Sequence, residues 1–165
     1  MPLTTEILQK YVKNIFVETG SRWGGGIRKA LKVGFKEIHS IEVREKPFYN
    51  CQRMFYGNKK VKLYFGDSSK ILWDVIKDID EPVTFWLDAH TEDSETDYNA
   101  FPVAKELDII ASHPIKTHTI IVDDLNCTEI FGSEYHWVVD VIKKINQGYV
   151  FEFYKSERGL LAATI

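Results

Sequence analysis

The chain has 165 residues and a formal net charge of −3, and 44% of its residues are hydrophobic. This composition is typical of a globular domain, and it disfavours general nucleic-acid binding, which normally requires a basic face. The sequence contains no apolar run near the roughly 20 residues of a membrane span and no secretory signal at its start. We therefore expect neither a membrane partner nor secretion.

The two cysteines bear on the location of the protein. Cys51 and Cys127 lie far apart in the sequence and form no Cys-x-x-Cys pair. Isolated cysteines of this kind are usual in the reducing cytoplasm. We therefore expect a cytoplasmic protein whose residues 1–165 form a single domain.

Strand-like and helix-like segments alternate along the chain, after one short helix within residues 1–14. The expected strands are Ile15–Thr19, Glu37–Val43, Val61–Phe65, Val83–Asp88, His118–Asp123, Tyr149–Tyr154 and Leu160–Ile165. The expected helices between them are Gly25–Val33, Phe48–Tyr56, Lys70–Ile79, Phe101–Ser112 and Ser133–Ile145. This order predicts a doubly wound α/β fold: a seven-stranded, mostly parallel sheet with helices on both faces and a C-terminal antiparallel hairpin.

Acidic residues stand at the ends of the first five expected strands. The five strand ends are Glu18-Thr19-Gly20, Glu42, Gly66-Asp67-Ser68, Asp88-Ala89-His90 and Asp123-Asp124. In a doubly wound sheet the ligand binds beyond the carboxyl ends of the strands. We therefore expect the functional site at this edge of the sheet, where the carboxylates gather.

A glycine-rich turn follows the first expected strand. The strand ends in Glu18, Gly20 follows, and the three glycines Gly24–Gly26 open the next helix. Glycine is placed where a strand turns sharply and the backbone must approach a ligand. The alternative is a purely structural turn with acids on the surface.

Two further strand ends fit a bound nucleoside. Glu42 lies about twenty residues beyond the glycine turn, where a carboxylate can accept the hydroxyls of a ribose. Asp67 and Ser68 follow the third strand, where a carboxylate and a hydroxyl can meet the exocyclic amine of adenine. The turn contains no Gly-x-Gly-x-x-Gly motif, which argues against a nicotinamide cofactor.

These residues resemble the class I S-adenosylmethionine-dependent methyltransferases, over essentially the whole chain and including the closing hairpin. The first motif of that family is acid-x-Gly-x-Gly-x-Gly. Glu18, Gly20 and Gly24 match it, whereas Arg22 replaces the middle glycine. The resemblance implies a Rossmann-like transferase fold in which S-adenosylmethionine is bound by Glu18, Thr19, Gly20, Ser21, Gly24, Glu42, Asp67, Ser68 and Asp88.

Three carboxylates end the fourth and fifth strands, which are neighbours in a sheet of this order. Asp88, Asp123 and Asp124 would raise one another's pKa unless a cation neutralised them. Hard divalent ions such as Mg²⁺ prefer oxygen ligands of this kind. The alternative is that Asp88 caps a loop while the Asp123-Asp124 pair orients backbone amides at a turn.

The same residues resemble the metal-dependent O-methyltransferases, particularly the macrocin O-methyltransferase and cephalosporin-hydroxylase-like branch. That resemblance implies that Asp88, Asp123 and Asp124 bind magnesium. It also implies that His90 is the general base, with Asp88 beside it at the catalytic centre.

The leading hypothesis is therefore metal-assisted methyl transfer from S-adenosylmethionine to a hydroxyl oxygen of a small molecule. One alternative is a metal-independent methyltransferase for a protein or nucleic-acid group, in which Asp88 and His90 orient the acceptor. Others are a non-catalytic nucleoside-binding subunit and a hydroxylase-like enzyme. Little sequence precedes the first strand, so the lid over the substrate is expected from residues 91–100 or from a partner subunit, which leaves a homo-oligomer open.

Overall fold

The computed structural model describes residues 3–89, 102–125, 136–155 and 159–165. Its strands are β1 (Ile15–Thr19), β2 (Glu37–Glu42), β3 (Val61–Phe65), β4 (Thr84–Leu87), β5 (Thr119–Asp123), β6 (Val150–Tyr154) and β7 (Leu160–Thr164). Its helices are α1 (Thr5–Gln9), α2 (Gly25–Val33), α3 (Glu45–Met54), α4 (Ser68–Ile76), α5 (Val103–Ser112) and α7 (His136–Ile145).

The described strands form one seven-stranded sheet in the order β3-β2-β1-β4-β5-β7-β6. The first five strands are parallel, and β7 pairs antiparallel with both β5 and β6. Strand order reverses between β1 and β4, so the crevice at which α/β proteins bind ligands lies at their carboxyl ends. The predicted fold class, with its closing hairpin, is confirmed.

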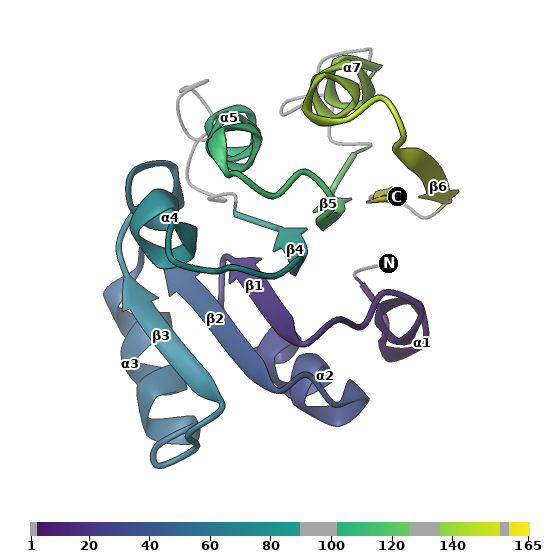
Figure 1. Ribbon diagram of the computed structural model, residues 1–165. Helices are drawn as coiled ribbons and strands as arrows, with labels where there is room; N and C mark the ends of the chain where they lie inside the picture. Colours follow the sequence, from purple (N-terminus) through teal and green to yellow (C-terminus); the bar gives the residue numbers. More distant parts are fainter. Residues whose placement is uncertain (1–2, 90–101, 126–135, 156–158) are drawn as a thin grey trace.

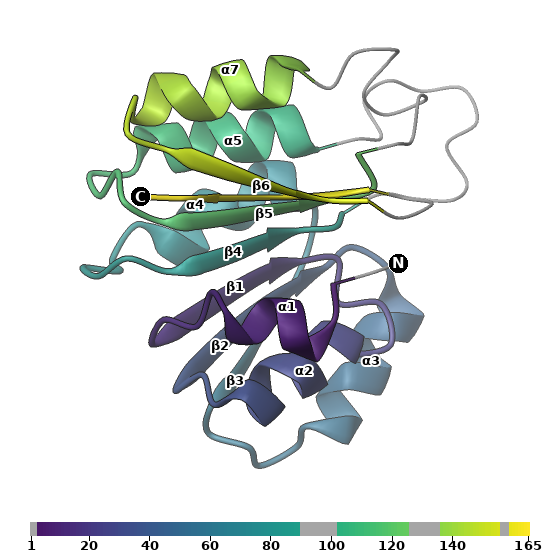
Figure 2. The same cartoon turned by 90° about the vertical axis from the view of Figure 1, so that its right-hand side faces the viewer.

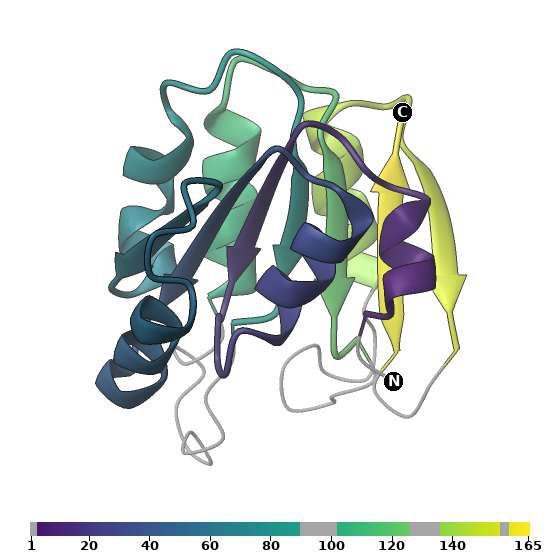
Figure 3. The same cartoon turned by 90° about the horizontal axis from the view of Figure 1, so that it is seen from below.

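Helices cover both faces of the sheet. Figure 2 shows α4, α5 and α7 on one face and α1, α2 and α3 on the other. Figure 1, turned by 90° from this view, shows the same two layers of helices on either side of the sheet. Seen from below in Figure 3, the parallel strands run side by side toward a common edge. Among the described residues, none of the helices combines the length and the apolar character that crossing a bilayer requires.

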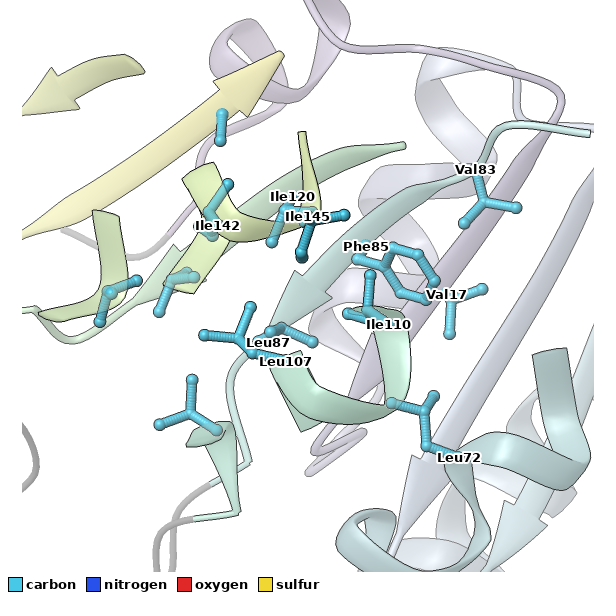
Figure 4. Close-up of a cluster of buried hydrophobic side chains, with 14 of the residues drawn as sticks. Val17, Leu72, Val83, Phe85, Leu87, Leu107, Ile110, Ile120, Ile142 and Ile145 are labelled. Atoms are coloured by element: carbon cyan, nitrogen blue, oxygen red, sulfur yellow. The ribbon is translucent and has the colours of Figure 1, made fainter. Parts of the chain in front are cut away.

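Alternation of side chains along the central strands produces two separate cores. In β1, Val17 points into the core under α4, α5 and α7, whereas Phe16 points into the core under α1, α2 and α3. Phe85 and Trp86 divide in the same way on β4. Figure 4 shows the first of these cores. Burial on both faces explains why these strands read as nearly continuous apolar runs.

Several element boundaries differ from the sequence prediction. Helix α3 begins at Glu45 rather than Phe48, because Pro47 is tolerated in the first turn of a helix. Helix α4 begins at Ser68 rather than Lys70, because the side chain of Asp67 caps it. Helix α4 also ends at Ile76 rather than Ile79, whereas β1, β3 and α2 have the predicted bounds. The ends of the other strands and helices differ from the prediction by at most two residues, and residues 133–135 of the last predicted helix lie outside the described residues.

A pair of buried histidines joins the starts of β4 and β5, at the end of the sheet away from the acidic strand ends. His118 donates from Nε2 to Nδ1 of His113 over 3.1 Å, and its own Nδ1 accepts the Val83 N–H. His113 in turn donates from Nε2 to the carbonyl of Ile76. One nitrogen of the His118 ring therefore accepts a hydrogen bond, which requires the uncharged ring. Burial, assisted by His113, lowers the pKa of His118 to about 4.

The burial of His118 makes stability depend on pH. Because folding lowers the pKa of His118 from 6.5 to about 4, the unfolded chain binds a proton more readily than the folded protein. The folded state is therefore favoured above pH 6.5 and loses stability as the pH falls from 6.5 toward 4. We expect the advantage of the wild type over His118→Gln, measured by urea unfolding, to shrink by about 1 kcal/mol between pH 7.5 and 5.5. His136→Gln, at an exposed site, should leave the pH dependence unchanged; an identical change in both variants would contradict the assignment.

Candidate functional site

The turn after β1 lies directly against the end of β4. Gly20 has φ +87°, and a Cβ placed there would come within 2.7 Å of the carbonyl oxygen of Asp88. The Gly20 N–H donates to the carbonyl of Ile41 on β2, and the Asp88 N–H donates to the carbonyl of Thr19. The ends of β1, β2 and β4 are thus joined through their backbones at one point, and only glycine fits between them.

The remaining glycines of the motif serve helix α2. Gly24 is the N-cap residue of α2 with φ +73°, and a Cβ there would come within 2.8 Å of the Phe55 ring. Gly26 lies in the first turn, where a Cβ would fall 1.7 Å from Oε1 of Glu18 and 2.3 Å from the Trp86 ring. The absence of a side chain at Gly26 therefore lets α2 pack onto Glu18.

Glu18 belongs to a buried chain of hydrogen bonds. Ser40 on β2 donates to Oε2 of Glu18 over 2.5 Å, and the hydroxyl of Ser21 lies 2.5 Å from that of Ser40. Oε1 of Glu18 has no hydrogen-bond partner among the described residues. Burial raises the pKa of Glu18 to about 8. A cationic ligand group beside this carboxyl would favour its ionised form and lower the pKa again.

Glu42 ends β2 with its carboxylate held by backbone donors. The Arg22 N–H donates to Oε2 over 2.6 Å, and the Arg44 N–H donates to Oε1 over 3.0 Å. The Nε of Arg44 also lies 3.4 Å from Oε1. Arg22, the residue at the middle glycine position of the motif, adopts the left-handed φ of +47°. Its conformation thus preserves a turn that glycine usually makes, and it directs an N–H at Glu42.

Asp67 caps helix α4, in addition to its predicted contact with adenine. One carboxylate oxygen accepts both the N–H and the hydroxyl of Ser69, and the other lies 3.2 Å from Nζ of Lys70. Burial alone would raise the pKa of Asp67, but these donors bring it below its usual value. Asp67 is therefore ionised at the N-terminus of α4, next to the buried Ser68.

The three carboxylates predicted to bind magnesium do not form a metal cluster in the part of the chain that the structure describes. Both oxygens of Asp123 accept backbone N–H groups, one from Asp124 over 2.9 Å and one from Leu3 over 3.4 Å. Asp124 is buried with a left-handed φ of +60°. The arrangement of Asp123 matches the alternative expectation, in which this pair orients backbone amides at a turn.

The structure brings several residues predicted to bind the cofactor to one edge of the sheet. Glu18, Thr19, Glu42 and Asp88 lie at the carboxyl ends of three adjacent parallel strands. Asp88 directly follows β4 and is partly exposed. His90, the predicted base, and residues 91–100, the predicted lid, lie outside the described residues.

Comparison with solved structures identifies the fold. The chain aligns over 97% of its length with a Staphylococcus aureus protein provisionally named caffeoyl-CoA O-methyltransferase, at 16% identity and a TM-score of 0.65, and covers 79% of that chain. An rRNA methylase from Streptococcus thermophilus aligns over 97% of this chain and 92% of its own at 11% identity and a TM-score of 0.65. The O-methyltransferase TomG from Streptomyces achromogenes, solved with S-adenosylmethionine, aligns over 98% and 77% at 12% identity and a TM-score of 0.62.

This is the fold of the class I S-adenosylmethionine-dependent methyltransferases. No family model matches the chain, and no curated protein matches its sequence. At identities of 11–16%, the likeness establishes the methyltransferase fold and leaves the activity to be argued from the site.

Within the methyltransferase fold, sequence reasoning missed four residues around the site. They are Arg22 and Arg44, which hold Glu42; Ser40, which holds Glu18; and Glu106, a fully buried acid on α5. Glu106 was detectable, because it interrupts an apolar helix face formed by Val103, Leu107 and Ile110. The backbone roles of Arg22 and Arg44 carry no such signal.

The contact at Gly20 can be tested by substitution. A left-handed backbone alone costs a non-glycine residue about 1 kcal/mol, and Gly57, with φ +76° and open space around it, isolates that cost. Gly20→Ala must also displace a backbone carbonyl, so we expect it to lower the free energy of unfolding by about 3 kcal/mol in urea titrations. Equal losses for Gly20→Ala and Gly57→Ala would show that the approach to Asp88 imposes no constraint.

Proposed function

We propose that this protein is an S-adenosylmethionine-dependent methyltransferase. The observation that carries the proposal is Glu42, whose carboxylate is buried at the end of β2 and fixed by the N–H groups of Arg22 and Arg44. A carboxylate fixed in this place is suited to accept the paired hydroxyls of a ribose. The close approach of Gly20 to Asp88 leaves backbone, rather than side chains, beside that position.

The described residues fit the parts of this cofactor. Asp67 and Ser68 would meet adenine, Glu42 the ribose, and Glu18 with the turn from Gly20 to Gly24 the methionine end. When bound, S-adenosylmethionine supplies an electrophilic methyl group on a positively charged sulfur. The acids at this edge favour a cationic cofactor, and Oε1 of Glu18 is a buried acceptor without a hydrogen-bond partner among the described residues.

The contribution of the chain itself is positioning and exclusion of water. Asp88 follows β4, next to the Gly20 turn, and would orient the acceptor there. We propose His90 as the base that removes the proton of the acceptor. The alternative, a non-catalytic nucleoside-binding subunit, would use the same cofactor-binding residues but would form no methylated product.

We propose an oxygen of a small neutral or cationic molecule as the acceptor. The acidic edge and the net charge of −3 disfavour a polyanionic substrate. Because one solved neighbour is named an rRNA methylase, RNA belongs in the test beside hydroxylated small molecules. A methylated product of either class, identified by mass, decides between them.

The first test of the proposal is cofactor affinity. Glu42→Ala removes a charged hydrogen-bond acceptor from the ribose, a loss of about 1.5–3 kcal/mol, so we expect S-adenosylhomocysteine to bind about 10- to 100-fold more weakly in calorimetric titrations. The control is Glu45→Ala, an exposed acid three residues further along the same edge. Equal affinities for the wild type and Glu42→Ala would remove the ribose assignment, and no binding to the wild type would overturn the proposed function.

Metal assistance is a separate prediction. The described carboxylates do not fit a magnesium site, because no three potential ligands among the described residues are grouped closely enough to hold an ion. We therefore assign no step to a metal, and we expect methyl transfer to survive EDTA. Turnover that disappears in EDTA and returns with Mg²⁺ would restore the metal-dependent mechanism and require ligands beyond those described.

A further inference from the structure

Glu106 is a completely buried acid with no assigned task. It lies in the first turn of α5 and is 0% exposed. Neither of its carboxyl oxygens has a hydrogen-bond partner among the described residues. A carboxyl group that is buried without partners costs several kcal/mol, so its retention indicates a task that an apolar residue could not perform.

The surroundings of Glu106 point toward the proposed nucleoside site. The polar groups close enough to act on its carboxyl are the hydroxyls of Ser68 and Thr19. Thr19 ends β1 directly before Gly20, and Ser68 begins α4 directly after Asp67. Thr19 and Ser68 thus both belong to the carboxyl edge of the sheet, where adenine is proposed to bind. Oγ1 of Thr19 is itself buried without a hydrogen-bond partner among the described residues.

The charge state of Glu106 determines how these hydroxyls point. An ionised carboxylate only accepts, so both hydroxyl protons would turn inward toward it and leave oxygen lone pairs facing the site. A protonated carboxyl donates one hydrogen bond, which frees a hydroxyl proton to point outward to a ring nitrogen of a base. The ionisation of Glu106 thus determines whether the two hydroxyls present only lone pairs to the site or can also present a proton.

The environment favours the uncharged form. Burial raises the pKa of Glu106 to about 7, against the lowering effect of the two hydroxyls. Among the described residues, the charged group that acts on it is Asp67, on the segment entering α4, and its negative charge raises the pKa further. A flat base placed over the edge would remove more water and disfavour the charge again.

We propose that Glu106 positions the adenine end of the nucleoside: in its uncharged form it orients the hydroxyls of Thr19 and Ser68, so that nucleoside binding is coupled to uptake of one proton by its carboxylate. This inference rests on the proposed function and adds a positioning residue to it. Glu106 would act through the two hydroxyls and not by contact with the ligand.

Adenosine is the probe that isolates this effect. It carries the base and ribose but no charge and no methionine end, so the titration of Glu18 has little influence on its affinity. We expect the dissociation constant of the wild type to rise about fivefold or more between pH 6 and pH 8.5, because the ionised form must first take up a proton. Titration at pH 7.5 in buffers of different ionisation enthalpy should register the proton taken up.

Glu106→Gln keeps the shape and a donor but cannot ionise. We expect it to bind adenosine with the same affinity at both pH values and without proton uptake. Glu106→Met, of similar volume, provides a second non-ionising variant should the amide disturb folding. Asp108→Asn, at an exposed site on the same helix, should retain the pH profile of the wild type.

Two failures can be told apart. If adenosine binds and the pH profile survives in both Glu106→Gln and Glu106→Met, the positioning role of Glu106 is overturned while the proposed function stands. If neither adenosine nor S-adenosylhomocysteine binds the wild type at any pH, the proposed function falls and this inference falls with it.

Discussion

Backbone hydrogen bonds between strand ends are the constraint on which the site depends. The Gly20 N–H reaches β2 at Ile41, the Asp88 N–H reaches β1 at Thr19, and the Gly66 N–H reaches β2 at Glu42. These bonds hold the turns after four neighbouring strands in register. The side chains that these strand ends carry therefore converge at one edge of the sheet, where their backbones are fixed.

The convergence has an energetic consequence, because it concentrates acids in a region largely closed to water. Burial raises the pKa of Glu18, Glu106 and Asp123. A buried acid of this kind opposes folding as the pH rises, whereas the buried His118 opposes folding as the pH falls. Perturbed carboxyls gathered at one strand edge, remote from a structural histidine pair, are the pattern expected of a binding site rather than of a scaffold.

Much of this arrangement followed from the sequence alone. Apolar runs ending in acids located the strands, and parallel pairing then required Glu18, Glu42 and Asp88 to share an edge. The sequence could not tell which way Asp123 would face, since its partner Leu3 lies 120 positions away. Nor could spacing show that Arg22 would take a left-handed turn and present its N–H to Glu42. Such features depend on contacts between distant segments, which local patterns do not record.

The contact between Leu3 and Asp123 also bears on how the protein can be handled. It draws the start of the chain to the carboxyl edge of the sheet, whereas Ile165 emerges at the opposite edge (Figure 2). Any fusion partner or affinity handle joined ahead of Leu3 would thus crowd the mouth of the proposed site. The same handle attached behind Ile165 would sit on the far side of the molecule and leave ligand access untouched.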